Sequence, residues 1–123
     1  MDDDADEVEA IVGDWSYLPE IAERYGLPLT RVRRFVADRE LIALRVGPRR
    51  ALAVPNGFLG PDGPRPELKG TFTVLADGGM NNLEIVRWLH TVDDTLPGGG
   101  TPLDALTRGR KREVRRRAQA LAF

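Results

Sequence analysis

Hydrophobic residues in the first third of the chain recur at helical spacing in two short runs. Over residues 18–25 they lie three and four positions apart, and the run stops at Gly26, a residue type that commonly follows a helix. A second run begins after Pro28 and covers residues 29–38. Its apolar stripe consists of Leu29, Val32, Phe35 and Val36. Two helices joined by so short a segment predict a helix-turn-helix.

The pattern after the second helix is typical of strands. Strand-forming apolar residues alternate through 43–46 and 51–54, and Gly47-Pro48 between them is a turn sequence. These residues predict an antiparallel hairpin with two arginines at its tip. A hairpin beside a helix-turn-helix is a wing.

Helical spacing returns in the second half of the chain. Helices are expected over residues 68–76, 81–90, 101–106 and 110–121. The glycine- and proline-rich residues 61–67 are expected to be a linker. The predicted fold class is mainly α. It consists of a winged helix-turn-helix with a small two-stranded wing over residues 15–60, followed by a small three- to four-helix bundle over residues 68–123.

The first fourteen residues are dominated by acids, and only Val8, Ile11 and Val12 could anchor them to a core. We therefore expect residues 1–14 to be an acidic flexible tail. Such a tail could simply increase solubility. Alternatively, it could fold back on the arginines of the helix-turn-helix and compete with DNA.

Charge changes the picture because it is strongly segregated. The formal net charge is only −1. Residues 1–23 carry −9 and residues 51–107 carry −4, whereas residues 24–50 and 108–123 carry +6 each. Sixteen of the eighteen basic residues are arginines, the side chain best suited to bidentate contacts with phosphate and guanine. A high-GC genome could explain part of the arginine excess but not its clustering, so two local fields favour a polyanionic partner.

The first basic block supplies the candidate site. Residues on the outward side of helix 29–38 are expected to face the major groove, where arginine can bridge O6 and N7 of guanine. Arginines of the hairpin 43–54 are expected to follow the flanking backbone or minor groove. The candidate DNA contacts are Thr30, Arg31, Arg33 and Arg34 on the helix and Arg45, Arg49 and Arg50 on the hairpin. Thr30 could instead bind a phosphate at the helix start. A merely solvated helix face is the alternative.

The second basic block lies in the final helix, where Arg112, Arg115 and Arg116 are expected to face outward. These arginines could make extra phosphate contacts that extend the DNA footprint. They could also pair with the acidic tail of the same or another chain, or form a solvated face.

Catalytic and metal-binding chemistry finds little support in the sequence. Cysteine is absent and His90 is the only histidine, so thiolate and multi-histidine metal sites are excluded. The glycines 98–100 lack the lysine and serine or threonine of a phosphate-binding loop. We therefore expect a protein that is not an enzyme and has no metal or cofactor. The acidic start lacks signal-peptide features and no apolar run could span a membrane, so we expect a cytoplasmic, nucleoid-associated protein.

Two stretches carry a resemblance to known families. The run LPEIAERYGLPLTRVRRFVADRELIALRVGPRRALAVP resembles the winged helix-turn-helix of the MerR and excisionase-like DNA-binding group. The whole chain, which ends in GGMNNLEIVRWLHTVDDTLPGGGTPLDALTRGRKREVRRRAQALAF, is similar to a family of small actinobacterial DNA-binding proteins. The resemblance implies sequence-directed binding to double-stranded DNA, by a transcriptional regulator or a nucleoid-associated factor.

The second half has a resemblance of its own. RWL, TLPGGGTPLDAL and the arginine-rich final helix are similar to the C-terminal, toxin-binding domain of Xre-type antitoxins. This likeness implies a protein partner, or self-association, through residues 68–123. Two hypotheses follow. In the first, the 29–38 helix enters the major groove and the 43–54 hairpin is the wing. In the alternative, the chain is an antitoxin-like or adaptor protein whose main ligand is another protein.

Overall fold

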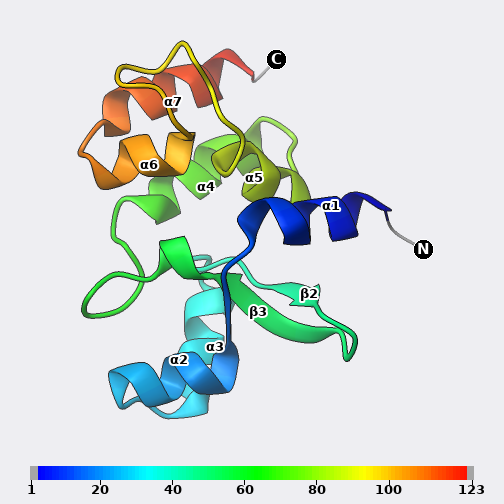
Figure 1. Cartoon of the computed structure of the whole chain (residues 1–123). Coiled ribbons are helices and arrows are strands. Elements are labelled where there is room, and N and C mark those ends of the chain that lie inside the picture. The colour runs from blue at the N-terminus through cyan, green and yellow to red at the C-terminus, as the bar shows by residue number, and fades with distance from the viewer. Residues whose placement is uncertain (1–2, 122–123) are drawn as a thin grey trace.

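The structure, a computed structural model, describes residues 3–121 as helices around one small sheet (Figure 1). Its elements are α1 (Asp3–Val12), β1 (Trp15–Tyr17), α2 (Leu18–Tyr25), α3 (Leu29–Ala37), β2 (Leu44–Val46), β3 (Ala51–Pro55), the 3-10 helix η1 (Asn56–Phe58), α4 (Leu68–Asp77), α5 (Asn82–Leu89), α6 (Pro102–Thr107) and α7 (Lys111–Ala120). The sheet lies between the α2–α3 pair and the helices of the second half (Figure 1). The predicted mainly α fold, with a winged helix-turn-helix followed by helices, is confirmed.

The helix-turn-helix forms for local reasons. The Glu20 carboxylate accepts a hydrogen bond from the Tyr17 backbone N–H at 2.7 Å, which satisfies a donor at the start of α2. Gly26 ends α2 in the left-handed conformation, with φ 63°, where a side chain would be unfavourable. The predicted bounds of α2 are confirmed, and α3 ends one residue before the predicted end.

The sheet has a strand that the sequence did not predict. Its order is β1-β3-β2, and both pairs are antiparallel. β2 and β3 form the predicted hairpin, whereas β1 pairs with the other edge of β3, with Tyr17 opposite Ala53. β1 is only three residues long, so it shows no alternation from which a strand could be recognised. As a result, the wing is hydrogen-bonded to the segment that starts α2.

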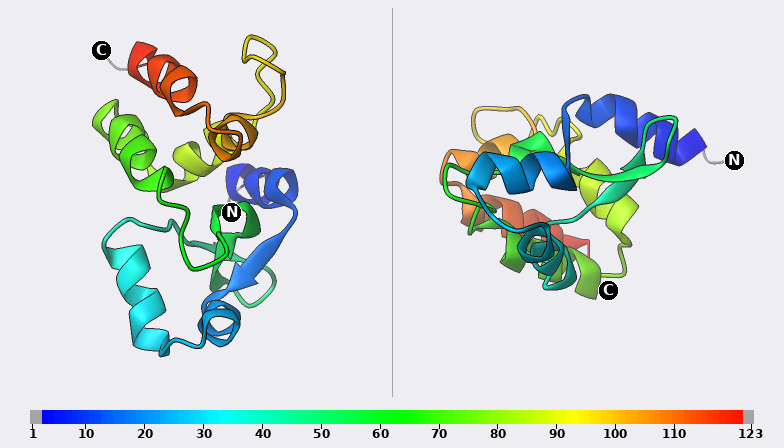
Figure 2. Two further views of the ribbon diagram at one scale, coloured as in Figure 1. Left: turned by 90° about the vertical axis from the view of Figure 1, so that its left-hand side faces the viewer. Right: turned by 90° about the horizontal axis from the view of Figure 1, so that it is seen from below.

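The expectation of an acidic flexible tail is wrong for the residues that the structure describes, because residues 3–12 form α1. Val8 is fully buried, and α1 packs against α5. The Arg87 guanidinium of α5 lies 3.5 Å from an Asp4 carboxylate oxygen and 3.6 Å from one of Glu7. α1 lies beside α5 and does not cover α3 (Figures 1 and 2). Residues 1 and 2 of the expected tail lie outside the described residues.

Four helices make the second half, α4 to α7. Two of them begin with reciprocal caps: Asn81 Oδ1 accepts from the Glu84 N–H at 2.8 Å, and Thr101 Oγ1 accepts from the Asp104 N–H at 3.1 Å. These caps fix the starts of α5 and α6 at the first residues of the predicted ranges 81–90 and 101–106. Within residues 3–121, no helix is both long enough and apolar enough to cross a membrane.

One hydrophobic core runs through both halves of the chain. Phe58, which ends η1, is fully buried. Its ring lies 5.2 Å from the ring of Phe72 in α4 and 5.7 Å from the ring of His90 after α5. The winged part and the helical part therefore pack as neighbours, with aromatic contacts where they meet.

Candidate nucleic-acid interface

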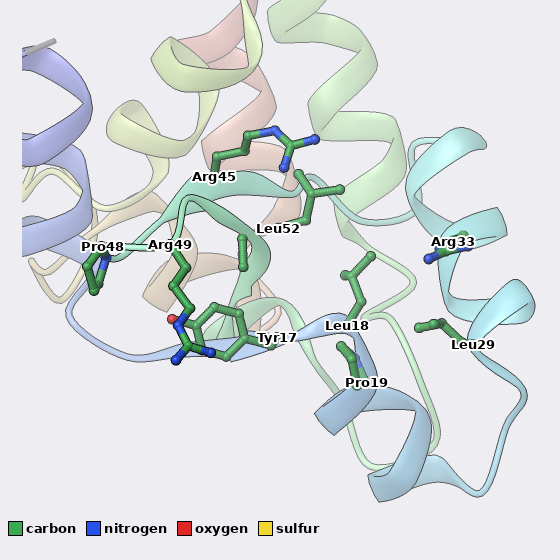
Figure 3. A pocket seen from close by; sticks show the side chains of 10 residues that line it. Tyr17, Leu18, Pro19, Leu29, Arg33, Arg45, Pro48, Arg49 and Leu52 are labelled. Carbon is green, nitrogen blue, oxygen red and sulfur yellow. The ribbon is translucent and has the colours of Figure 1, made fainter. Parts of the chain in front are cut away.

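A hollow of about 800 Å³ separates α3 from the wing (Figure 3). It is lined by Tyr17, Leu18, Pro19, Leu29, Arg33, Arg45, Pro48, Arg49, Ala51 and Leu52. We call this set the wing groove. Arg33 comes from α3 on one side of the groove, and Arg45 and Arg49 come from the hairpin on the other (Figure 3). Three of the seven predicted contacts are therefore brought together around one open space.

The floor of the wing groove is apolar. Tyr17 is 38% exposed although it is a large aromatic residue. Its hydroxyl approaches the wing turn, since a Cβ placed on Gly47 would lie 3.1 Å from Tyr17 Oη. Tyr17 was not among the predicted site residues. The sequence does place Tyr17 directly before the helix predicted from Leu18. Its position beside the wing depends on strand β1, which was not predicted.

The other flank of α3 carries Thr30, Arg31 and Arg34 beside a second, smaller depression. The Arg31 guanidinium carbon lies 5.6 Å from the centre of the Phe35 ring, a cation–π contact. Arg34 Nε lies 3.4 Å from an Asp38 carboxylate oxygen, in a pair that is largely exposed to solvent. An exposed pair of this kind contributes little stability, so a nucleic-acid phosphate or base can compete for Arg34. α3 thus presents cations on both of its flanks.

The last predicted contact, Arg50, has a different setting. Arg45 Nη1 crosses the hairpin and hydrogen-bonds the Arg50 carbonyl oxygen at 3.1 Å. Arg50 has a positive φ of 53°, and its side chain lines a depression on the face of the wing toward Ala5 and Leu83. It is therefore the one wing arginine that the structure does not bring to the groove.

The wing turn is also held from outside the hairpin. Glu9 Oε1 in α1 accepts a hydrogen bond from the Gly47 N–H at 3.1 Å. Trp15 Nε1 donates to the Glu9 carbonyl oxygen at 3.1 Å. The acidic helix α1 therefore supports the wing. Only the tertiary structure shows this arrangement.

The C-terminal arginines lie far from this interface. α7 and α3 are at opposite ends of the molecule in both side views (Figures 1 and 2). Arg112 and Arg116 are exposed, as predicted, but Arg115 is half-buried and not fully outward. Its guanidinium lies against Gly70 of α4, where a Cβ would come within 2.1 Å of Nη2. The absence of a side chain at Gly70 is what lets Arg115 fold inward.

The environment of His90 is that of a packed residue. Its Nδ1 lies 2.7 Å from the Val86 carbonyl oxygen, and its ring contacts Phe58. Burial lowers the pKa of His90 below its ordinary value of 6.5, although the Val86 hydrogen bond and the charge of Asp104 act in the opposite direction. Within residues 3–121, no three histidine, cysteine or acidic side chains gather where they could hold a metal ion.

Known proteins share this arrangement. Residues 5–59 match a family described as "DNA-binding protein Rv2175c, wHTH domain", and residues 66–122 match the "Rv2175c C-terminal domain of unknown function". The DNA-binding protein Rv2175c of Mycobacterium tuberculosis is 35% identical over 117 residues, with 86% of this chain and 79% of that protein covered. The NMR structure of Rv2175c superposes with a TM-score of 0.76 at 33% identity, covering 89% of this chain and 82% of that one.

Both family models match in order, and the solved relative has the same fold along most of its length. The chain belongs to the Rv2175c family, with its winged helix-turn-helix domain and its C-terminal domain.

Proposed function

We propose that this protein binds double-stranded DNA without catalysis, with α3 in the major groove and the β2–β3 wing along the flanking backbone. The observation that carries the proposal is the wing groove, where Arg33, Arg45 and Arg49 surround one open space of about 800 Å³. A hollow with cations on both walls suits a phosphodiester strand that passes between helix and wing. The family match supports it, since the mycobacterial relative is named a DNA-binding protein.

The individual contacts follow from where each side chain lies. Arg33 and Arg34 are exposed on opposite flanks of α3, so they are our candidates for base edges. Thr30 stands in the first turn of α3, where free backbone N–H groups favour a phosphate. Arg45 and Arg49 approach from the wing and neutralise backbone phosphates. Arg31 adds charge on the outer flank, and Arg50 reaches DNA only along the far side of the wing.

The finer roles are also proposals. A single recognition helix and wing bury a modest interface, so a regulator with high specificity needs a second module or a second copy. The MerR- and excisionase-like docking, the transcriptional role and nucleoid association in the cytoplasm all rest on the resemblance of residues 18–55. A protein partner for residues 68–123, as in the antitoxin-like alternative, stays a prediction.

A salt titration with three variants tests the DNA proposal. Arg33→Ala should weaken binding and relax base preference by about 1–3 kcal/mol, because a bidentate base contact is lost. Arg49→Ala should weaken all sequences similarly and reduce the salt slope by about 1, because one phosphate contact is lost. Fluorescence anisotropy against a duplex library selected with the parent protein measures both.

Lys69→Ala is the matched control, since it removes one exposed charge from α4, outside the wing groove. It should bind like the parent. If Arg33→Ala and Arg49→Ala also bind like the parent at low salt, the groove is not the DNA site.

A further inference from the structure

We propose that the basic face of α7 binds a second DNA segment, so that one molecule bridges two duplexes. The inference rests on the proposed function, because the first duplex is held by α3 and the wing. The face is a shallow surface lined by Lys111, Arg112, Arg115, Arg116 and Gln119, which we call the α7 face. Three of its four cations, Lys111, Arg112 and Arg116, are exposed.

The cations of the α7 face are placed where they disfavour the helix. Lys111 and Arg112 occupy the first turn, where the helix dipole repels positive charge. Arg112 and Arg116 are four residues apart, so they stand on the same side and repel each other. That first turn holds one acid, Glu113, beside its two cations, whereas a solvated face chosen for stability would place acids there and cations toward the C-terminus. An external polyanion removes this repulsion.

Few acids within the molecule balance the α7 face. Glu113 is the one acid of α7, and its carboxylate lies 3.2 Å from Arg117 Nη1, while Arg117 Nε lies 3.7 Å from an Asp93 carboxylate oxygen. Arg116 is further from Glu113, at 3.9 Å. Arg112 makes no ion pair within residues 3–121, and Arg115 Nε is buried without a hydrogen-bond partner among those residues. The charge of the face is therefore available to a ligand.

The position of the α7 face indicates a second duplex and not an extension of the first. α3 and α7 lie at opposite ends of the molecule, with the sheet and the other helices between them (Figures 1 and 2). Duplex DNA is stiff over about 150 base pairs, so a duplex seated along α3 turns away from α7 unless it is sharply bent. The acidic α1 lies between the two basic ends and repels a wrapped strand (Figure 1).

The test is a bridging assay with the full chain. A biotinylated duplex on beads, saturated with protein, should retain a fluorescent second duplex, and retention should fall as salt rises. Arg112→Ala/Arg116→Ala should reduce retention to that of beads without protein. Its affinity for a single duplex should stay within about twofold of the parent's, because no phosphate contact to the first duplex is lost. Arg112→Lys/Arg116→Lys keeps both charges and should still retain the second duplex.

Folding is checked on the same variants. Arg112→Ala/Arg116→Ala should keep or raise Tm, because alanine relieves the like-charge repulsion and favours the helix. A clear fall in Tm would mean that the two arginines serve the helix itself, and the bridging proposal would be abandoned.

Three other results would overturn the inference. In the first, the alanine pair still retains the second duplex, which means that copies associate and each holds one duplex through α3. In the second, the alanine pair loses single-duplex affinity, which means that one bent duplex touches both ends. In the third, retention returns when the alanine pair is mixed with Arg33→Ala/Arg34→Ala, which means that two associated copies, and not one molecule, hold the two duplexes. Failure of the proposed function looks different, because the parent would then bind no single duplex.

Discussion

At the scale of single residues, His90 links protonation to folding. It lies where the two halves meet. Its ring packs against the ring of Phe58, and its Nδ1 lies within hydrogen-bond distance of the Val86 carbonyl oxygen. Burial holds the pKa of folded His90 below 6.5, so the unfolded chain binds the proton more tightly. The resulting stability is fully present above pH 6.5. It is lost as the pH falls from there toward the pKa of the folded state.

We predict that His90→Gln flattens the dependence of Tm on pH between about pH 7 and pH 5, where histidine is the side chain that ordinarily titrates. Thermal melts of parent and variant across this range measure it. Asp93 does not interfere: hydrogen bonds from Thr95 lower its pKa below 3.8, so it acts only at more acid pH. Equal slopes for the two proteins would show that His90 stays accessible to protons in the folded state.

The candidate site was predictable where it depends on helix geometry. Thr30, Arg31, Arg33 and Arg34 lie off the apolar stripe of α3, and periodicity alone places them outside. The contacts that hold the wing turn and that place the arginines of α7 were not predictable. Glu9 meets Gly47 across 38 residues, and Arg115 turns inward only because Gly70 lies beneath it on another helix. Such pairs depend on tertiary packing, which a local pattern does not encode.

At the scale of elements, α1 shows how packing overrides composition. An acidic segment with few apolar residues forms little helix alone, but α5 offers a surface for Val8 and a cation, Arg87, for Asp4 and Glu7. β1 was missed for a related reason, because its partner β3 lies almost forty residues away. The helices α2 and α3 were predicted because their caps and apolar stripes are local.

We predict that Val8→Ala lowers the free energy of unfolding by about 2 kcal/mol, because it removes fully buried methyl groups and leaves a cavity. Ile11→Ala is the matched control on the same helix. Ile11 is 42% exposed, so its truncation should change stability by less than about 0.5 kcal/mol. Urea unfolding measures both. Equal, small effects would show that α1 does not belong to the core in solution.

At the scale of the whole molecule, the two halves share one core and should unfold together. The chain contains two tryptophans, Trp15 in β1 and Trp88 in α5, and each reports on one half. We predict that Trp15→Phe and Trp88→Phe, each with one remaining tryptophan, show the same urea midpoint by fluorescence and by circular dichroism. Within either variant, a fluorescence midpoint that differs from the circular dichroism midpoint would mean that the halves unfold independently.

At this scale, the positive charge is concentrated at two opposite ends of the molecule and is not spread evenly over its surface. The two +6 blocks, residues 24–50 and 108–123, supply α3 and α7 at opposite ends, and the acidic α1 lies between them. The segregation of charge was predictable from the sequence, but the places of the two basic blocks at opposite ends of the fold were not. The near-neutral total therefore describes a molecule with two separate positive surfaces.

The place of Phe58 has a consequence for protein engineering. The family model of the winged domain ends at residue 59, and that of the second domain begins at residue 66. A chimera joined between these limits would take Phe58 from one parent and Phe72 and His90 from the other, although the Phe58 ring contacts both of these rings. Grafting this winged domain onto a new C-terminal half therefore requires a matching aromatic pocket in the acceptor. The boundary suitable for recombination differs from the one that sequence comparison draws.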